Sequence, residues 1–179
     1  MGQYYQVVFF NNDGSPRYSV DPHVFGYGSK LSEHFQLKSE VVNAVECMLS
    51  SGGRIAWCGD YADPEPVQIN GFDGEPMNLY HHVEYMDPVS KYDPTLFNAV
   101  NYDMVMETYL VNHSKKEFVY VNKNTDTGPH PLVMLTVEGN GRGGGDYHGE
   151  NDYIGRWARN HICVSWEEPE GYSQLITDF

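Results

Sequence analysis

The residues best suited to chemistry gather in a glycine-rich run, Gly-Asn-Gly-Arg-Gly-Gly-Gly-Asp-Tyr-His-Gly, at positions 139–149. Glycine adopts backbone conformations closed to other residues and lets a ligand approach closely, and successive N–H groups in such turns can form a nest for an anion. The run lacks the Gly-Lys-Ser/Thr of a P-loop, and no helix is predicted to open there as a dinucleotide fingerprint requires. Three roles remain: a turn in which Arg142 binds a carboxylate such as Asp60, a ligand loop, or a loop that contacts a partner. The side chains available for the last two roles are Asn140, Arg142, Asp146, Tyr147 and His148.

Histidine and aspartate are numerous enough for a metal centre, but their spacing does not favour one. The sequence has no His-x-x-x-His or His-Glu-x-x-His pair that would place two imidazoles on one helical face. The pair Asp60 and Asp63 lacks the further oxygen ligands and the glycine of a calcium loop. We therefore expect no cofactor. If a metal does bind, the best candidate ligands are His23, Asp60, Asp63 and His148.

Nucleophilic catalysis has no complete signature in the sequence. Cys47 falls on the core side of a predicted helix, Cys58 in a predicted buried strand, and no Gly-x-Ser-x-Gly elbow is present. The third cysteine, Cys163, makes the number odd, and no Cys-x-x-Cys pair supports a disulfide framework or a zinc site. We expect reduced thiols, assign no catalytic residue, and do not take an enzyme as the leading interpretation.

The charge balance favours a protein partner over nucleic acid. With 25 acidic against 11 basic residues, the formal net charge is −14, which repels phosphate backbones and anionic membranes and attracts basic proteins. Tyrosine adds contact area at low entropic cost beside carboxylates that can meet Lys or Arg. The predicted acidic and aromatic partner face consists of Asp60, Asp63, Tyr85, Asp87, Tyr92, Asp93, Tyr153, Glu167, Glu168 and Glu170.

The elements that must position these residues are mainly strands. Runs of β-branched and aromatic residues predict strands, and Val41, Val45 and Leu49 recur at helical spacing in one main helix at about residues 39–51. We expect one α+β domain, residues 1–179, with a largely antiparallel sheet, that helix and long loops. No stretch reaches the ~18 apolar residues of a membrane span. The predicted strands are 4–10, 17–20, 54–58, 104–112, 117–122, 132–137 and 162–166, and short helices are predicted near 77–82 and 154–159.

Several motifs together carry a family resemblance. They are the Met-Gly-Gln-Tyr-Tyr start, the motif Gly-Asp-Tyr-Ala-Asp at 59–63, the loop Asn-Gly-Arg-Gly-Gly-Gly-Asp at 140–146, and Gly155-x-Trp157. They resemble a group of small uncharacterised proteins of bacteriophages, prophages and related mobile elements of bacteria. The chain departs from those relatives in having Ser165-Trp166-Glu167 where they carry a second Gly-Asp-Tyr. The resemblance implies a genomic setting, and with it the cytoplasm of a bacterial host.

Charge and resemblance lead to the same expectation about function. A phage protein with many carboxylates and no catalytic motif could inhibit a basic defence protein that handles nucleic acid, such as a CRISPR-type nuclease, by placing carboxylates where phosphates bind. Such an anti-CRISPR-like DNA mimic would bind neither nucleic acid nor membrane directly. Two alternatives stay open: a small enzyme or a ligand- or metal-binding domain using the glycine-rich loop, and a minor virion or assembly component.

Overall fold

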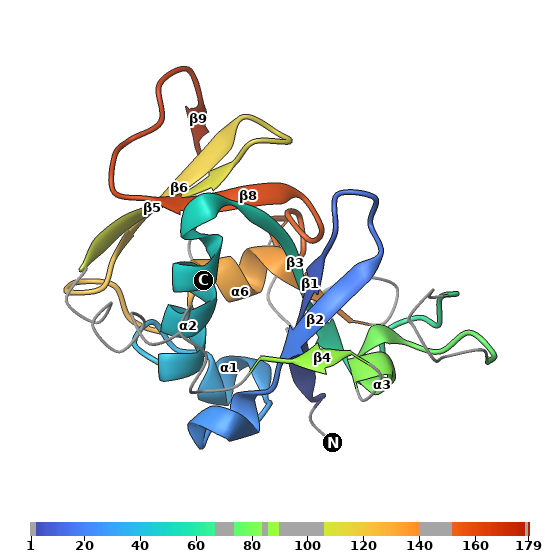
Figure 1. Ribbon diagram of the computed structural model, residues 1–179. Coiled ribbons are helices and arrows are strands. Elements are labelled where there is room, and N and C mark those ends of the chain that lie inside the picture. Colours follow the sequence, from blue (N-terminus) through green and yellow to red (C-terminus); the bar gives the residue numbers. More distant parts are fainter. Residues whose placement is uncertain (1–2, 67–73, 84–85, 90–105, 140–151, 178) are drawn as a thin grey trace.

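The computed structural model describes residues 3–66, 74–83, 86–89, 106–139, 152–177 and 179, although for Ser32 and Asp87 only the backbone is described. Within them the chain has the expected α+β architecture, with one sheet, one main helix and connecting loops (Figure 1). The strands follow the order β4 (Asp87–Pro88), β2 (Pro16–Val20), β1 (Tyr5–Phe10), β3 (Gly53–Gly59), β8 (His161–Ser165), β5 (Glu107–Asn112), β6 (Glu117–Asn122) and β9 (Ser173–Gln174), and β7 (Val137–Glu138) pairs with β3.

The first half of the chain follows the sequence prediction closely. It contains β1 (Tyr5–Phe10), β2 (Pro16–Val20), the 3-10 helix η1 (Pro22–Phe25), the short helix α1 (Leu31–His34), α2 (Glu40–Met48), η2 (Leu49–Ser51) and β3 (Gly53–Gly59). The main helix predicted at about 39–51 is therefore confirmed as α2 and η2. Ser39 occupies the N-cap position but makes no side-chain cap hydrogen bond. Gly52, at φ +83, ends the helical segment.

The second half contains the predicted hairpin and two errors of prediction. Its elements are α3 (Leu79–His82), β4 (Asp87–Pro88), β5 (Glu107–Asn112), β6 (Glu117–Asn122), α6 (Pro131–Thr136), β7 (Val137–Glu138), β8 (His161–Ser165) and β9 (Ser173–Gln174). The β5–β6 hairpin pairs in regular antiparallel register from Glu107 with Asn122 to Asn112 with Glu117. Residues 152–159 form turns and not the short helix expected over 154–159.

The predicted strand over residues 132–137 is wrong, because residues 131–136 form helix α6 and only Val137 continues into β7. His130 caps the helix by accepting a hydrogen bond from the backbone N–H of Leu132, and Pro131 occupies its first turn, where proline is favoured. The residues from Leu132 to Thr136 are all buried. A helix buried on every side shows no amphipathic period, so its apolar run looks like a buried strand in the sequence.

The sheet is largely antiparallel, with a few short parallel pairs. The pairs β1–β2, β1–β3, β3–β8, β5–β6 and β5–β8 are antiparallel, whereas β2–β4, β3–β7 and β6–β9 are parallel. Two strands, β8 and β7, pair with the same edge of β3. Its first residues pair with β8, and Trp57 and Cys58 pair with Val137 and Glu138 of β7.

Both faces of the central strands are covered. On the first face, Ile55 and Trp57 of β3 join the main core, which also takes in the apolar residues of α2 and α6. On the second face, Ala56 and Cys58 pack with Val8, Phe10 and α3 in a smaller cluster. Since side chains alternate along a strand, burial on both faces explains why β1 and β3 read as nearly continuous apolar runs. Figure 1 shows α3 well apart from α2 and α6.

A buried polar cluster joins α2 to the segment between β6 and α6. The Nζ of Lys123 donates to Glu46 Oε2 at 2.6 Å and to Asn43 Oδ1 at 2.9 Å. His130 Nε2 lies 3.1 Å from Glu46 Oε1, although this contact is not aligned as a hydrogen bond. Because His130 Nδ1 accepts from Leu132 N, the ring proton lies on Nε2, facing the carboxylate. Glu46 thus fixes α2 against both ends of the segment that connects β6 to α6.

Removing the charge of Glu46 should destabilise the fold strongly. In Glu46→Gln the ammonium of Lys123, which is 2% exposed, loses its counter-charge inside the protein. Breaking a buried pair from one side typically costs about 3–5 kcal/mol. Urea denaturation should report a loss of that size in the free energy of unfolding. The matched control is Glu40→Gln at the exposed start of the same helix, for which we expect less than about 1 kcal/mol; equal effects of the two variants would contradict this role.

The same carboxylate should contribute to acid unfolding. Burial alone raises the pKa of Glu46, but His130 and Lys123 outweigh it and hold the pKa below its ordinary value of 4.5. The folded state therefore gains stability from ionised Glu46 above that value, and loses it as the pH falls through the depressed folded pKa. In Glu46→Gln this part of the pH dependence should disappear.

Candidate functional site

The two segments that flank the glycine-rich run are both hydrogen-bonded to strand β3. Glu138, the last residue of β7, immediately precedes the run and pairs with Cys58. After the run, the backbone N–H of Arg159 donates to Ile55 O at 2.8 Å. In return, Arg54 Nη1 donates to Arg159 O at 2.9 Å. Arg159 adopts a left-handed backbone conformation at φ +62, which is costly for a residue with a Cβ and must be held by its surroundings.

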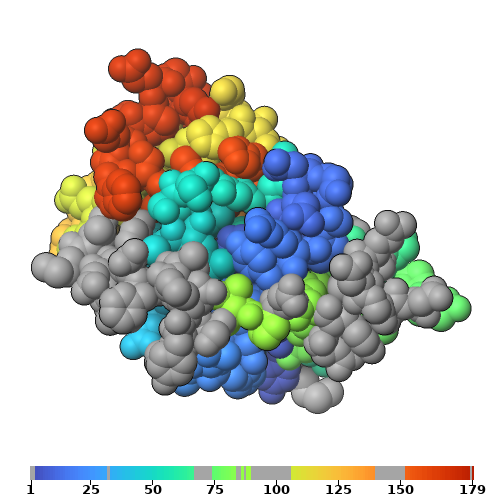
Figure 2. Space-filling view, viewed as in Figure 1, coloured from blue at the N-terminus to red at the C-terminus, as the bar shows by residue number. Residues whose placement is uncertain are grey.

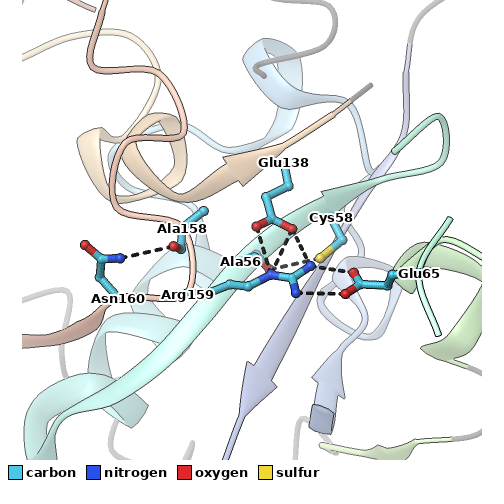
Figure 3. A network of polar contacts seen from close by, with 7 residues as sticks. All are labelled: Ala56, Cys58, Glu65, Glu138, Ala158, Arg159 and Asn160. Atoms are coloured by element: carbon cyan, nitrogen blue, oxygen red, sulfur yellow. Dashed lines mark hydrogen bonds and ion pairs between the residues drawn. The ribbon is translucent and has the colours of Figure 1, made fainter. Parts of the chain in front are cut away.

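The side chain of Arg159 binds two carboxylates that come from distant parts of the chain (Figure 3). Its Nε donates to Glu138 Oε1 at 2.9 Å, and its Nη2 donates to Glu138 Oε2 at 2.8 Å. Toward Glu65, 94 residues away in sequence, Nη1 donates to Oε2 at 2.9 Å and Nη2 to Oε1 at 2.5 Å. The planar guanidinium thus makes a two-point contact with each carboxylate, the strongest geometry for such pairs.

This site, the Glu138–Arg159–Glu65 network, is partly withdrawn from solvent. The side chains of Arg159, Glu65 and Glu138 are 27%, 17% and 8% exposed, and the guanidinium carbon lies 4.9 Å from the centre of the Phe10 ring. Burial alone lowers the pKa of Arg159, but the hydrogen bonds and charges of Glu65 and Glu138 raise it well above its ordinary value. The formal charge of the network is −1, and its arginine serves attachment, because Arg159 stays protonated and does not exchange its proton.

The segment that returns from the glycine-rich run is fastened at further points. The backbone N–H groups of Gly155 and Trp157 donate to Met134 O and Leu135 O of α6 at 2.8 and 2.7 Å. Trp157 is fully buried, and its indole N–H donates to Glu117 Oε2 at 3.0 Å. Arg156 also binds Glu117, which lowers the pKa of that carboxyl. The Gly155-x-Trp157 motif thus anchors the segment along α6.

Two of the predicted site residues, Asp60 and Asp63, lie just after β3. Asp60 Oδ1 accepts a hydrogen bond from the backbone N–H of Tyr4 at 3.1 Å, and its carbonyl accepts one from Asn78 Nδ2 at 2.7 Å. Asp63 is exposed. The carboxylate of Asp60, which the sequence offered as a binding site for Arg142, therefore already holds the N-terminal segment.

The other predicted acidic residues lie elsewhere on the sheet. Glu167, Glu168 and Glu170 are exposed and follow β8, and β8 runs past the start of β3 while Asp60 follows its end. The structure does not bring these two acidic groups together. Tyr153 is half-buried and packs against the main core, with Arg156 5.8 Å from its ring centre.

The remaining predicted site residues lie wholly or partly outside the described part of the chain. Of Asp87, only the backbone is described, in β4. The others, Tyr85, Tyr92, Asp93, Asn140, Arg142, Asp146, Tyr147 and His148, lie outside the described residues.

A metal centre has no assembled ligand set among the residues that the structure describes. His23 Nδ1 lies 2.9 Å from Asp21 Oδ1 at the exposed start of η1, and Asp60 is engaged with Tyr4. His148, the fourth candidate, falls in the part that is not described.

Sequence reasoning missed the arginine and both carboxylates of the network. Arg159 stood in a predicted short helix, Glu138 at the end of a predicted strand, and Glu65 in a segment with few predicted elements. The 94-residue separation of Arg159 and Glu65 leaves no local pattern. The position of Glu138 just before the glycine-rich run was the one signal that could have suggested a role.

A surface pocket of about 210 Å³ lies near the C-terminus, lined by Leu37, Val119, Tyr120 and Phe179 among others. It shares no residue with the network. Its volume is below the ~300 Å³ of ordinary small-molecule sites, and we assign it no ligand.

Comparisons of the chain with protein-family models, with curated proteins and with solved structures returned no match. Helices long and apolar enough to cross a membrane are not found in the described part of the chain. The class that the structure defines is thus an α+β fold with a carboxylate-bound arginine at the base of a glycine-rich run.

Replacing Arg159 by lysine should weaken the attachment of the segments that flank the glycine-rich run, while keeping the net charge. A point-charge ammonium cannot reproduce the paired contacts to two carboxylates, so Arg159→Lys should lower the free energy of unfolding by about 1–3 kcal/mol. Trypsin should also cleave after Arg142 faster in this variant, as followed by mass spectrometry. The matched control is Arg156→Lys, an arginine that is more exposed than Arg159 and binds a single carboxylate, so this variant should change both readouts less. Indistinguishable variants would refute the role of Arg159.

Proposed function

We propose that this protein is a non-enzymatic, acidic interaction protein of phage or mobile-element origin that inhibits a basic, nucleic-acid-handling defence protein of the bacterial cytoplasm. A CRISPR-type nuclease is the partner that this chemistry fits best. The glycine-rich run is the contacting element, and carboxylates take the places of phosphates in the partner's basic groove.

The observation that carries the proposal is that several of the chain's few cations are paired with its own carboxylates. The formal net charge is −14 with 11 basic residues, and Lys30, Lys123, Arg156 and Arg159 form ion pairs with the chain's own glutamates. Lys123, Arg156 and Arg159 neutralise carboxylates that are largely buried, whereas Lys30 pairs with the exposed Glu33. Glu167, Glu168, Glu170 and Asp63 stay exposed, which favours long-range attraction to a basic protein.

The anchoring of the glycine-rich run also supports the proposal. Both flanks are fixed, by Glu138 and Arg159 to β3 and by Trp157 to Glu117. A binding loop fixed at its base loses less conformational entropy when it meets a partner than one attached to mobile ends. The network uses its arginine for attachment, which suits a binding role.

The two acidic groups at different places on the sheet allow a sharp test. The variants Asp60→Asn/Asp63→Asn and Glu167→Gln/Glu168→Gln change the net charge equally, so each controls for the other. We expect the wild-type protein to inhibit target-DNA cleavage by a purified guide-loaded CRISPR-type nuclease, and one of the two variants to lose at least about tenfold in inhibitory potency. Equal loss in both would show attraction by net charge alone, without the defined binding face proposed here.

Ionic strength provides the second readout. Raising it from about 0.1 M to about 1 M shortens the Debye length from about 10 Å to about 3 Å, so binding through exposed carboxylates should weaken steeply. The free nuclease must be assayed in the same buffers, because its own DNA binding is salt-dependent. A panel of basic defence nucleases left fully active by the protein at low salt would overturn the proposal.

A further inference from the structure

A cysteine and a histidine meet on the second face of the sheet, away from the Glu138–Arg159–Glu65 network. His113 follows β5, and Cys163 is the middle residue of β8, where it pairs with Val111. Their side chains lie with His113 Nε2 3.2 Å from Cys163 Sγ. This is the spacing of a thiol and a base that can exchange a proton.

A third residue orients the imidazole. His113 Nδ1 lies 2.8 Å from the hydroxyl oxygen of Tyr172, and Lys116 Nζ donates to the same oxygen at 3.1 Å. The ammonium of Lys116 also lies 4.8 Å from the centre of the Tyr172 ring. Tyr172 therefore holds the ring so that Nε2 faces the sulfur, and Lys116 fixes Tyr172.

The thiol of Cys163 can be reached from outside. Cys163 alternates along β8 with Ile162 and Val164, which are buried in the main core, so its side chain projects from the opposite face and is half-buried. Cys58, by contrast, is 1% exposed. The β5–β6 hairpin and the C-terminal segment lie side by side (Figures 1 and 2), and the C-terminal segment brings Tyr172 to His113.

We propose that Cys163 is a modification site, a thiol activated by His113 that forms a mixed disulfide with a low-molecular-weight disulfide. His113 Nε2 takes the thiol proton as Sγ attacks one sulfur of the reagent. The new Sγ–S bond forms as the reagent's S–S bond breaks, and the leaving thiolate receives the proton from His113. Cys163 is oxidised from thiol to disulfide, and the leaving half of the reagent is reduced to a thiol.

The pair reacts by general-base catalysis and not through a resting thiolate. Burial raises the pKa of Cys163, while burial, His161 and Lys116 lower the pKa of His113, and both shifts disfavour a resting thiolate–imidazolium pair. The thiol proton therefore moves to His113 only as Sγ attacks. The cation of Lys116, which donates to the hydroxyl of Tyr172, favours an anionic reagent and an anionic leaving thiolate. Disulfides of acidic peptides such as glutathione have this chemistry.

The test uses the whole protein and oxidised glutathione as the probe. Intact-mass spectrometry at pH 7.5 should show one glutathionyl group added, and peptide mapping should place it on Cys163. His113→Gln should slow the reaction by at least about tenfold, since general-base catalysis is worth that or more. His161→Gln is the matched control, because it removes the neighbouring imidazole without touching the thiol, and its rate should stay within about threefold of the wild type.

The pH profile separates an activating histidine from a merely structural one. The wild-type rate should rise through the titration of His113, below about pH 6.5, and then level off. In His113→Gln it should climb only in the alkaline range where the thiol ionises. The titratable groups that face the pair are Tyr172, Lys116 and His161. If His113→Gln does not fold, Tyr172→Phe serves as the second variant, and its reaction rate on the pH plateau should be lower than that of the wild type.

Three results would overturn the proposal: no adduct at all, an adduct on Cys47, or equal rates and equal pH profiles in folded wild type and His113→Gln. The inference does not depend on the proposed inhibition of a nuclease. Failure of the thiol reaction would leave that proposal standing, and a protein without inhibitory activity could still carry the modified cysteine.

Discussion

The arrangement around the glycine-rich run depends on one interaction, the binding of Arg159 by Glu65 and Glu138. It joins the residue before the run, the residues after it and a segment 94 positions earlier in the chain. A cation between two carboxylates that are largely removed from water leaves one carboxylate charge unbalanced. Five aligned N–H···O contacts offset that cost, and the left-handed backbone of Arg159 is held by its exchange of hydrogen bonds with β3.

Buried polar groups recur as connectors in this fold. Glu46 holds Lys123 and His130 against α2, and Glu117 holds Arg156 and Trp157, so the glutamates bind segments that no strand pairing joins. In a chain with long loops, such ion pairs fix connections that hydrophobic contacts alone leave free to slide. The exposed carboxylates that remain give the molecule its acidic surface, and the thiol of Cys163 adds a position at which that surface could be altered chemically.

The sequence predicted the fold well where the pattern was local, and the site poorly where it was not. The strands β1, β3, β6 and β8 and the helix α2 carried clear periodicity or β-forming runs, and the α+β architecture follows from them. Helix α6 was mistaken for a strand because it is buried on all sides. The expected pairing of Arg142 with Asp60 stays a prediction, because Arg142 lies outside the described residues; the arginine that the structure describes beside the run is Arg159. His113 and Cys163 are 50 residues apart and meet only through strand pairing, which composition cannot show.

The most direct measurement compares the affinity of wild-type protein and Arg159→Lys for one basic guide-loaded nuclease at one salt concentration. The two proteins carry the same net charge, so any difference reports the geometry at the base of the glycine-rich run. The account predicts that Arg159→Lys, kept folded at low temperature, binds at least about tenfold more weakly, a loss of about 1.4 kcal/mol. Equal affinities would show that this base has no part in recognition, and would contradict the central claim.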